Sequence, residues 1–192
     1  MLTFFKSAIR TIYCLPPPRL TLIALLILFL WAIMSRIRPK GWRAVNLILI
    51  PLSVICVLFA TLICREAGGQ RGTYLIPFEK WKWALIQPEY YREMFMNGLL
   101  FVSFGMTASC LLPEKRGIAA RILLAVFLAL TVSTAVEYLQ YRMNVGYFET
   151  DDILCNALGA FFGAAHLILA RYLPNIIDRL YGVGARTGKD ER

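Results

Sequence analysis

Residues 137–163 read EYLQYRMNVGYFETDDILCNALGAFFG, and this stretch joins two strongly apolar segments of the chain. Its polar side chains gather near the junction, at Glu137, Gln140, Asp151, Asp152 and Asn156. Ionisable groups are expensive inside a membrane and are kept mostly where they bind or react with something. The stretch therefore predicts two membrane helices with a polar site at the place where they meet.

The whole chain has the composition of a membrane protein. Hydrophobic residues make up 58% and charged residues 17% of the 192 residues, and the mean hydropathy is +0.59. Crossing about 30 Å of hydrocarbon takes roughly 20 apolar residues, and several segments approach that length: 19–34, 44–64, 94–112, 118–140 and 153–173. We expect an all-α integral membrane helical bundle of about five transmembrane helices, occupying 19–173 and followed by a tail at 174–192.

An N-terminal segment at 1–18 precedes the first span. Its apolar residues at helical spacing suit a short helix in the membrane interface that ends at the prolines at 16–18. An unstructured lead-in fits the same residues equally well.

Lysine and arginine indicate the orientation. The loop between the first two spans carries Arg36, Arg38, Lys40 and Arg43, the loop before the fourth span carries Lys115 and Arg116, and the tail adds more. Because such loops stay on the cytoplasmic side, we expect a multi-pass protein of the cell membrane with a cytoplasmic C-terminus. The acidic junction at 149–152 then faces outward.

The net charge of +9 would suggest nucleic-acid binding in a soluble protein, but here the basic residues suit topology and contact with anionic lipid. The sequence holds no zinc-binding motif, phosphate-binding glycine loop or basic aromatic patch. The five cysteines lack C-x-x-C spacing and are expected to be small apolar packers. Membrane lipids are the expected partners, and the sequence requires no nucleic acid, metal or other cofactor.

The segment at 65–93 is rich in aromatic residues with a polar edge. It interleaves Trp81, Trp83, Tyr90 and Tyr91 with Lys80 and Lys82. Such rings settle at the headgroup level, so we expect this segment to lie along the outer leaflet. It would be either a lid or wall over the polar site or a simple interfacial anchor.

Three polar residues share one depth in the membrane. Asn97, Glu137 and Asn156 each lie about three residues inside a span, or roughly 5 Å below its outer edge at 1.5 Å per residue. Because adjacent spans run antiparallel, side chains at one depth can reach each other. With Gln140 and Asp152, which share helix faces with Glu137 and Asn156, they form the candidate ligand-binding cluster.

Glycines offer a way to bring this cluster together. Gly159 and Gly163 form a G-x-x-x-G pair on the face that carries Asp152 and Asn156, and such pairs let helix backbones approach closely. We expect them to press the last span against the fourth, and Gly105 on the third span to serve helix packing as well.

Several of these residues also have a plainer interpretation. Asn97 and Asn156 could simply hydrogen-bond between helices, and Asp151 could be a solvated helix-start residue, where aspartate is favourable. Glu137 could form a structural pair with a neighbouring polar side chain. His166, the one histidine, is expected to pack or to make a local hydrogen bond.

Three sequence elements, in order, resemble the VanZ-like family of membrane proteins. The first is LIPF at 75–78, the second is NGLLFVSFG at 97–105, and the third runs from Glu137 and Gln140 through Gly146, Phe148, Asp152 and Asn156 to Gly159 and Gly163. The resemblance covers about 71–163. It departs from the family pattern where Tyr74, Ser103, Tyr147 and Glu149 stand in place of the usual Asn, Pro, Arg and Asp.

The resemblance implies an envelope protein of the kind associated with resistance to teicoplanin, a lipid-tailed glycopeptide, and it identifies no catalytic residue. The first hypothesis is a non-enzymatic protein whose outer polar pocket engages a lipid, a cell-wall precursor or a lipid-tailed glycopeptide. The second is an enzyme acting on a lipid-linked substrate, with Glu137 and Asp152 as acid and base or as Mg²⁺ or Ca²⁺ ligands. The third is a structural or assembly subunit of envelope machinery.

Overall fold

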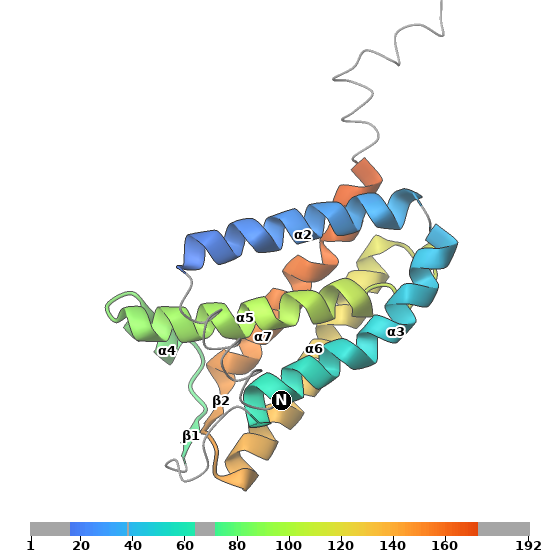
Figure 1. Ribbon diagram of the computed structural model, residues 1–192. Coiled ribbons are helices and arrows are strands. Elements are labelled where there is room, and N and C mark those ends of the chain that lie inside the picture. Colours follow the sequence, from blue (N-terminus) through green and yellow to red (C-terminus); the bar gives the residue numbers. More distant parts are fainter. Residues whose placement is uncertain (1–15, 38, 64–71, 173–192) are drawn as a thin grey trace, which may run out of the picture.

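The computed structural model describes residues 16–37, 39–63 and 72–172, which form a bundle of helices (Figure 1). The long helices are α2 (Pro17–Ile37), α3 (Pro39–Leu58), α5 (Pro88–Ala108), α6 (Ile118–Met143) and α7 (Thr150–Ala164). Shorter elements connect them: the π-helix η1 (Phe59–Ile63), the strands β1 (Thr73–Tyr74) and β2 (Phe148–Glu149), the helix α4 (Glu79–Ala84) and the 3₁₀ helix η2 (Glu114–Arg116). The expected interfacial helix and the tail at 174–192 lie outside the described residues.

Within these ranges, four helical segments are long and apolar enough to cross a membrane: Pro17–Met34, Ala44–Leu62, Ile118–Met143 and Thr150–Tyr172. They confirm the predicted all-α membrane bundle. The other predicted span, 94–112, corresponds to α5, which begins at Pro88 rather than near residue 94. Proline is favourable at the first helical position, where no intrahelical N–H bond is lost. The last part of the predicted loop at 65–93 is therefore helix.

α5 and α7 form the most extensive helix pair, and glycines permit their close approach. A Cβ atom added at Gly105 would collide with the backbone of Ala160, and one at Gly159 would collide with the carbonyl of Gly98. Gly163 meets the backbone of α5 in the same way. The expectation that the last span presses its glycines against the fourth is therefore wrong: they face α5, because the small residues of α5 leave room there.

The core between α3, α5, α6 and α7 mixes large side chains with alanine. Its buried cluster consists of Val57, Phe101, Phe104, Ala108, Ile122, Ala125, Ala129, Val136, Ala160 and Ala164. Small residues are favoured between membrane helices, where lipid gives little hydrophobic drive to association and contact depends on close packing. This packing fixes α6 and α7, the helices that carry four of the five candidate site residues.

The connection from α6 to α7 turns sharply and meets a segment from earlier in the chain. α6 ends at Met143, and its C-cap residue Asn144 has a φ of 59°, a left-handed conformation that asparagine tolerates better than most residues. β2 then pairs in parallel with β1, with Thr73 opposite Phe148 and Tyr74 opposite Glu149. This short pairing brings Glu149 and the start of α7 against the segment that leads into α4.

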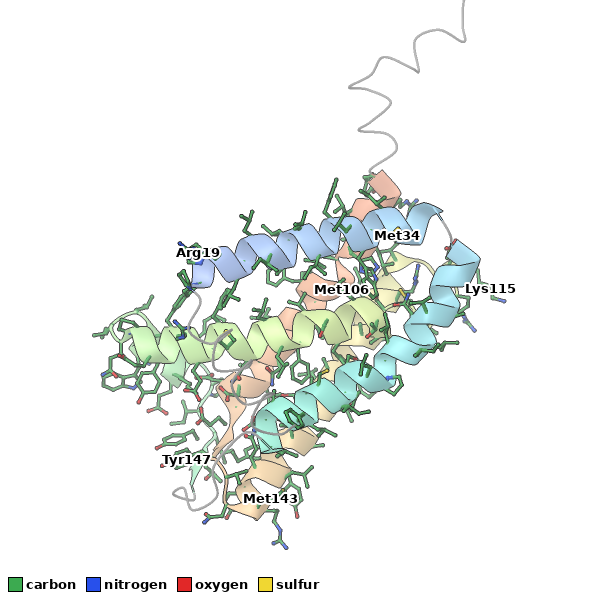
Figure 2. All side chains as sticks on the ribbon, viewed as in Figure 1. Arg19, Met34, Met106, Lys115, Met143 and Tyr147 are labelled. Atoms are coloured by element: carbon green, nitrogen blue, oxygen red, sulfur yellow. The ribbon has the colours of Figure 1, made fainter. Side chains whose placement is uncertain are left out.

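The two ends of the bundle differ in their elements. Figure 2 shows Tyr147 at one end and Lys115 at the other. The first end also holds β1, β2 and α4 (Figure 1), and we call it the α4 end.

Candidate functional site

Lys80 on α4 lies at the centre of a buried group of charges at the α4 end. Its Nζ donates to Glu149 Oε2 at 2.6 Å and to Asp152 Oδ1 at 3.2 Å, and it lies 3.1 Å from Glu93 Oε2. The three carboxylates come from β2, α7 and α5, so one ammonium joins four elements. Lys80 is only 8% exposed, and lysine is almost never buried to this degree unless it is paired.

The carboxylates keep Lys80 charged. Burial alone lowers the pKa of its ammonium, but the negative charges of Asp152, Glu93 and Glu149 outweigh that effect and raise the pKa. Burial also raises the pKa of the Glu149 carboxyl; Asp152 adds to this rise and Lys80 opposes it. Three carboxylates around one ammonium leave the group with an excess of negative charge.

Asp151 fixes the start of α4. Its carboxylate accepts the backbone N–H of Phe78 at 2.6 Å and that of Lys80 at 2.7 Å. Phe78 has a φ of 66°, in the left-handed region that a bulky residue rarely occupies, and these charge-assisted hydrogen bonds hold it there. The interpretation of Asp151 as a solvated helix-start residue is wrong, since Asp151 is 4% exposed and bound to α4.

A pocket of about 330 Å³ opens beside this charge group, and we call it the polar pocket. Its charged walls are Glu79, Lys80, Glu93, Glu149 and Asp151, and its aromatic walls are Tyr74, Trp83, Tyr90 and Tyr147. Tyr74 and Tyr147 meet edge to face, with ring centroids 5.2 Å apart. Of the two roles considered for the segment at 65–93, a wall over a polar site matches the positions of Trp83 and Tyr90.

The structure joins two of the five predicted site residues to this group. Asp152 binds Lys80, and Glu137 Oε2 accepts the backbone N–H of Glu149 at 3.1 Å. Asp152 and Glu137 are each 2% exposed, and neither lines the polar pocket. They contact Lys80 and Glu149 without lining the pocket themselves, and they hold these two residues in place.

The other three predicted residues lie apart from the charge group. Asn156 Nδ2 donates to Ser133 Oγ at 2.8 Å, and Gln140 Nε2 donates to the Thr61 carbonyl at 3.2 Å. Each of these amides leaves a buried oxygen with no partner among the described residues. Asn97 is half-buried on α5. Ligand binding by the five residues stays a prediction.

Lys80, Glu93 and Glu149 belong to the charge group but are not among the five predicted site residues. Lys80 was expected only to flank interfacial aromatic rings, because its local sequence gives no sign of carboxylates about seventy residues later in the chain. One signal was available. The acidic run of Glu149, Asp151 and Asp152 at a membrane boundary calls for a basic partner if it is buried.

Other titratable groups are placed as follows. Among the described residues, no group of three or more His, Cys, Asp or Glu side chains is arranged to hold a metal ion. Cys56, Cys110 and Cys155 are free thiols. His166 Nδ1 lies 2.9 Å from the Gly163 carbonyl oxygen, which is the local hydrogen bond expected.

A comparison with protein families gives one match. A family model described as VanZ/LLP1 matches residues 20–171. The match extends beyond 71–163, where the motifs lie, and includes α2 and α3. No curated protein and no solved structure matches the chain.

Proposed function

The chain belongs to the VanZ/LLP1 family, and we propose that it is a multi-pass protein of the bacterial cell membrane whose polar pocket binds the polar head of a lipid-linked molecule. The ligand classes are a membrane lipid, a cell-wall precursor and a lipid-tailed glycopeptide. Capture of a lipid-tailed glycopeptide would contribute to resistance of the teicoplanin type.

One observation carries the proposal: the polar pocket combines buried charges with aromatic walls at the end of a bundle of membrane-spanning length. Glu93 and Glu149 offer acceptors, while the ammonium of Lys80 holds both carboxylates in place. Tyrosine and tryptophan rings have an apolar face and a polar edge, which suits a ligand that is part hydrocarbon. A volume of about 330 Å³ lies at the small end of the range for ligand sites, so the pocket suits one head group rather than a whole lipid.

The charges of the pocket favour a head group that carries an amine. Four carboxylates line it against the single ammonium of Lys80, so its net charge is negative. An ammonium group on the ligand gains from these carboxylates and from aromatic faces such as that of Trp83. A purely anionic head would be repelled. Hydroxyl and amide N–H groups of the ligand can donate to the carboxylate oxygens.

In this proposal the α4 end faces outward. The basic loops expected in the cytoplasm include the one with Lys115 and Arg116, and Lys115 lies at the end opposite to Tyr147 (Figure 2). Since loops rich in lysine and arginine stay inside, the polar pocket faces the side from which a drug arrives.

The five predicted site residues take different roles in this proposal. Asp152 and Glu137 do not line the pocket; they position Lys80 and Glu149, which do. Asn97 lies one helical turn after Glu93 on the same face of α5. In this position its amide can contact a ligand that extends from the pocket toward the middle of the bundle. Gln140 ties α6 to η1, and Asn156 ties α7 to α6, so both steady the helices beneath the site.

Teicoplanin and vancomycin susceptibility in a Gram-positive host tests the resistance role. The strains carry an empty vector, the protein, Glu93→Gln or Glu89→Gln at matched membrane expression. Glu93 suits the test because its side chain is 35% exposed, so it can reach a ligand and its loss should spare the fold. Glu89 is the matched control, since it lies on α5, is exposed and does not line the pocket.

We expect the protein and Glu89→Gln to raise the inhibitory concentration of teicoplanin, and Glu93→Gln to lose this effect. Vancomycin, which lacks the lipid tail, should show little change. An unchanged teicoplanin susceptibility with the native protein, or equal protection by both variants, would overturn the role of the pocket in resistance.

A further inference from the structure

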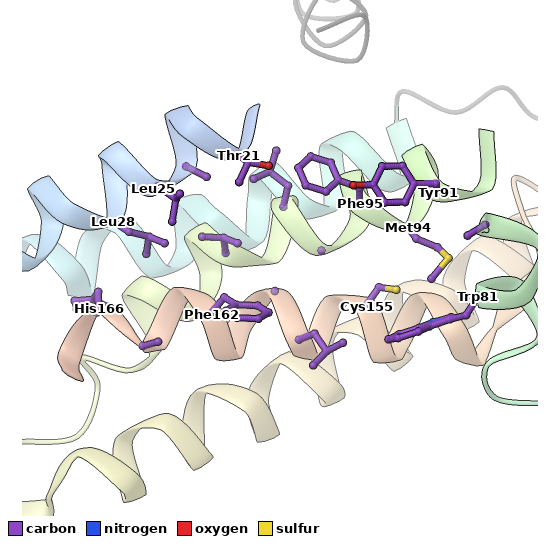
Figure 3. Close-up of a pocket in the computed structure, with 18 of the residues that line it drawn as sticks. Thr21, Leu25, Leu28, Trp81, Tyr91, Met94, Phe95, Cys155, Phe162 and His166 are labelled. Atoms are coloured by element: carbon purple, nitrogen blue, oxygen red, sulfur yellow. The ribbon is translucent and has the colours of Figure 1, made fainter. Parts of the chain in front are cut away.

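The helices α4 and α5 also wall a second cavity, from faces other than those that line the polar pocket. This cavity lies between α2 and the α5–α7 pair (Figure 3) and has a volume of about 760 Å³. Its wall is almost entirely apolar, with side chains such as Leu25, Phe95 and Phe162. We call it the apolar cavity.

The apolar cavity is elongated. Figure 3 shows His166 beside Leu28 at one end and Trp81 beside Cys155 at the other. Cys155 and His166 lie eleven residues apart in the last helical segment, or about 16 Å at 1.5 Å per residue. The shape and lining suit a single long hydrocarbon chain.

The hydrogen bond of His166 determines what its second ring nitrogen can do. Nδ1 lies 2.9 Å from the carbonyl oxygen of Gly163, and a carbonyl only accepts, so Nδ1 carries the proton. An apolar setting favours the neutral ring, in which Nε2 is a hydrogen-bond acceptor. His166 is 2% exposed, and its Nε2 has no partner among the described residues.

Water is a poor partner for this acceptor. A buried water needs about two to four polar contacts, and the apolar wall provides few. The hydroxyl of Thr21, another polar group of the lining, already donates to the Pro17 carbonyl at 2.9 Å. A molecule that covers the apolar wall and carries one hydrogen-bond donor would both shield the apolar side chains from water and give Nε2 a partner.

We propose that the apolar cavity binds a long-chain membrane alcohol. The hydroxyl donates to His166 Nε2, and the hydrocarbon chain lies along α2, α5 and α7 toward Trp81. A fatty carboxylate or a phosphodiester lacks the proton that Nε2 needs, and its charge would be buried against an apolar wall. The site is separate from the polar pocket and does not depend on the function proposed for that pocket.

Binding of 1-hexadecanol and of its methyl ether to the purified protein in detergent tests this site, with native mass spectrometry as the readout. The ether keeps the chain and the oxygen but cannot donate a hydrogen bond. We expect the protein to prefer the alcohol by about tenfold, as one hydrogen bond predicts. His166→Phe keeps a ring and removes the acceptor, so it should bind both compounds equally.

Two further variants test the location. Leu28→Trp should fill the cavity and abolish binding of both compounds, with Ala24→Phe as a second block if the first variant does not fold. Ile27→Trp is the control, because Ile27 is 47% exposed and lies outside the cavity lining. Absence of alcohol binding, equal binding of alcohol and ether by the native protein, an alcohol preference that survives His166→Phe, or binding that survives a blocking variant would each overturn the proposal.

Discussion

Lys80 on α4 and Asp152 on α7 are 72 residues apart in the chain, and the Nζ and Oδ1 atoms of their side chains lie 3.2 Å apart. Glu93 on α5 and Glu149 on β2 share the same ammonium. The LIPF motif at 75–78 leads into α4, and the acidic run at 149–152 leads into α7. One buried lysine therefore explains why these distant sequence elements occur together: they build the same site.

Lys80→Met should destabilise the protein by about 3–5 kcal/mol, because it leaves the buried carboxylate of Asp152 and the largely buried carboxylate of Glu149 without their cation. Denaturant or thermal unfolding of the purified protein in detergent measures this loss. Lys82→Met is the control, since Lys82 is an exposed residue of the same helix and its loss should change stability little. Equal stability of Lys80→Met and the native protein would show that Lys80 does not centre the charge group.

Asp151→Asn should loosen the start of α4 at a cost of about 1–3 kcal/mol, because a neutral amide cannot replace both charge-assisted hydrogen bonds to Phe78 and Lys80. Hydrogen exchange resolved along the chain reports on this directly. We expect faster exchange of the amides at 78–84 and unchanged exchange within α6. Protection of α4 equal to that in the native protein would contradict the role of Asp151.

The fold could be predicted because its signals are local. Apolar length identifies the membrane helices, and Asp152, Asn156 and Glu137 are visible as polar residues inside such segments. What could not be predicted is which helix each residue meets. The G-x-x-x-G spacing predicts a close contact without naming the partner, and the glycines of α7 meet α5 rather than α6.

The centre of the site was missed for a similar reason. Lys80 lies among aromatic residues that are typical of a membrane interface, and only the pairing of β1 with β2 brings Glu149 and Asp152 to it. Glu137 was recognised as a buried carboxylate, but its bond to the backbone of Glu149 depends on the turn at Asn144. Long-range contacts of this kind are set by packing and have no local signature.

Gly159→Ala should destabilise the bundle by about 1–3 kcal/mol or more, because its Cβ would collide with the Gly98 carbonyl between two packed backbones. Gly98→Ala is the matched comparison: its Cβ would lie 3.3 Å from the Cys155 carbonyl oxygen, so the loss should be smaller. Thermal unfolding of the two variants in the same detergent checks the order. A milder effect at Gly159 than at Gly98 would contradict the packing of α5 on α7.

Glu149 should make stability fall as pH rises above the ordinary glutamate pKa of about 4.3. Its pKa is raised in the folded protein, so the folded state holds the proton more tightly than the unfolded chain does. The contribution of Glu149 to the free energy of unfolding is therefore greatest at low pH and declines as the pH passes from the ordinary to the raised pKa. Glu149→Gln removes this pH-dependent contribution.

The difference in melting temperature between the native protein and Glu149→Gln, followed from acid to neutral pH, measures the pH-dependent contribution of Glu149 to stability. We expect the difference to shift in favour of Glu149→Gln as pH rises through this window. Parallel curves for the two proteins would show that the pKa of Glu149 is not raised in the folded state.

The most direct measurement is equilibrium binding of teicoplanin to the purified protein in lipid nanodiscs, for the native chain, Glu93→Gln and Glu89→Gln. If the polar pocket receives the ligand's polar head, the native chain and Glu89→Gln should bind with the same Kd. Loss of the Glu93 carboxylate should weaken binding about tenfold or more, as expected for a hydrogen bond to a charged group. Equal affinity of Glu93→Gln and Glu89→Gln, or no binding by the native chain, would contradict the account.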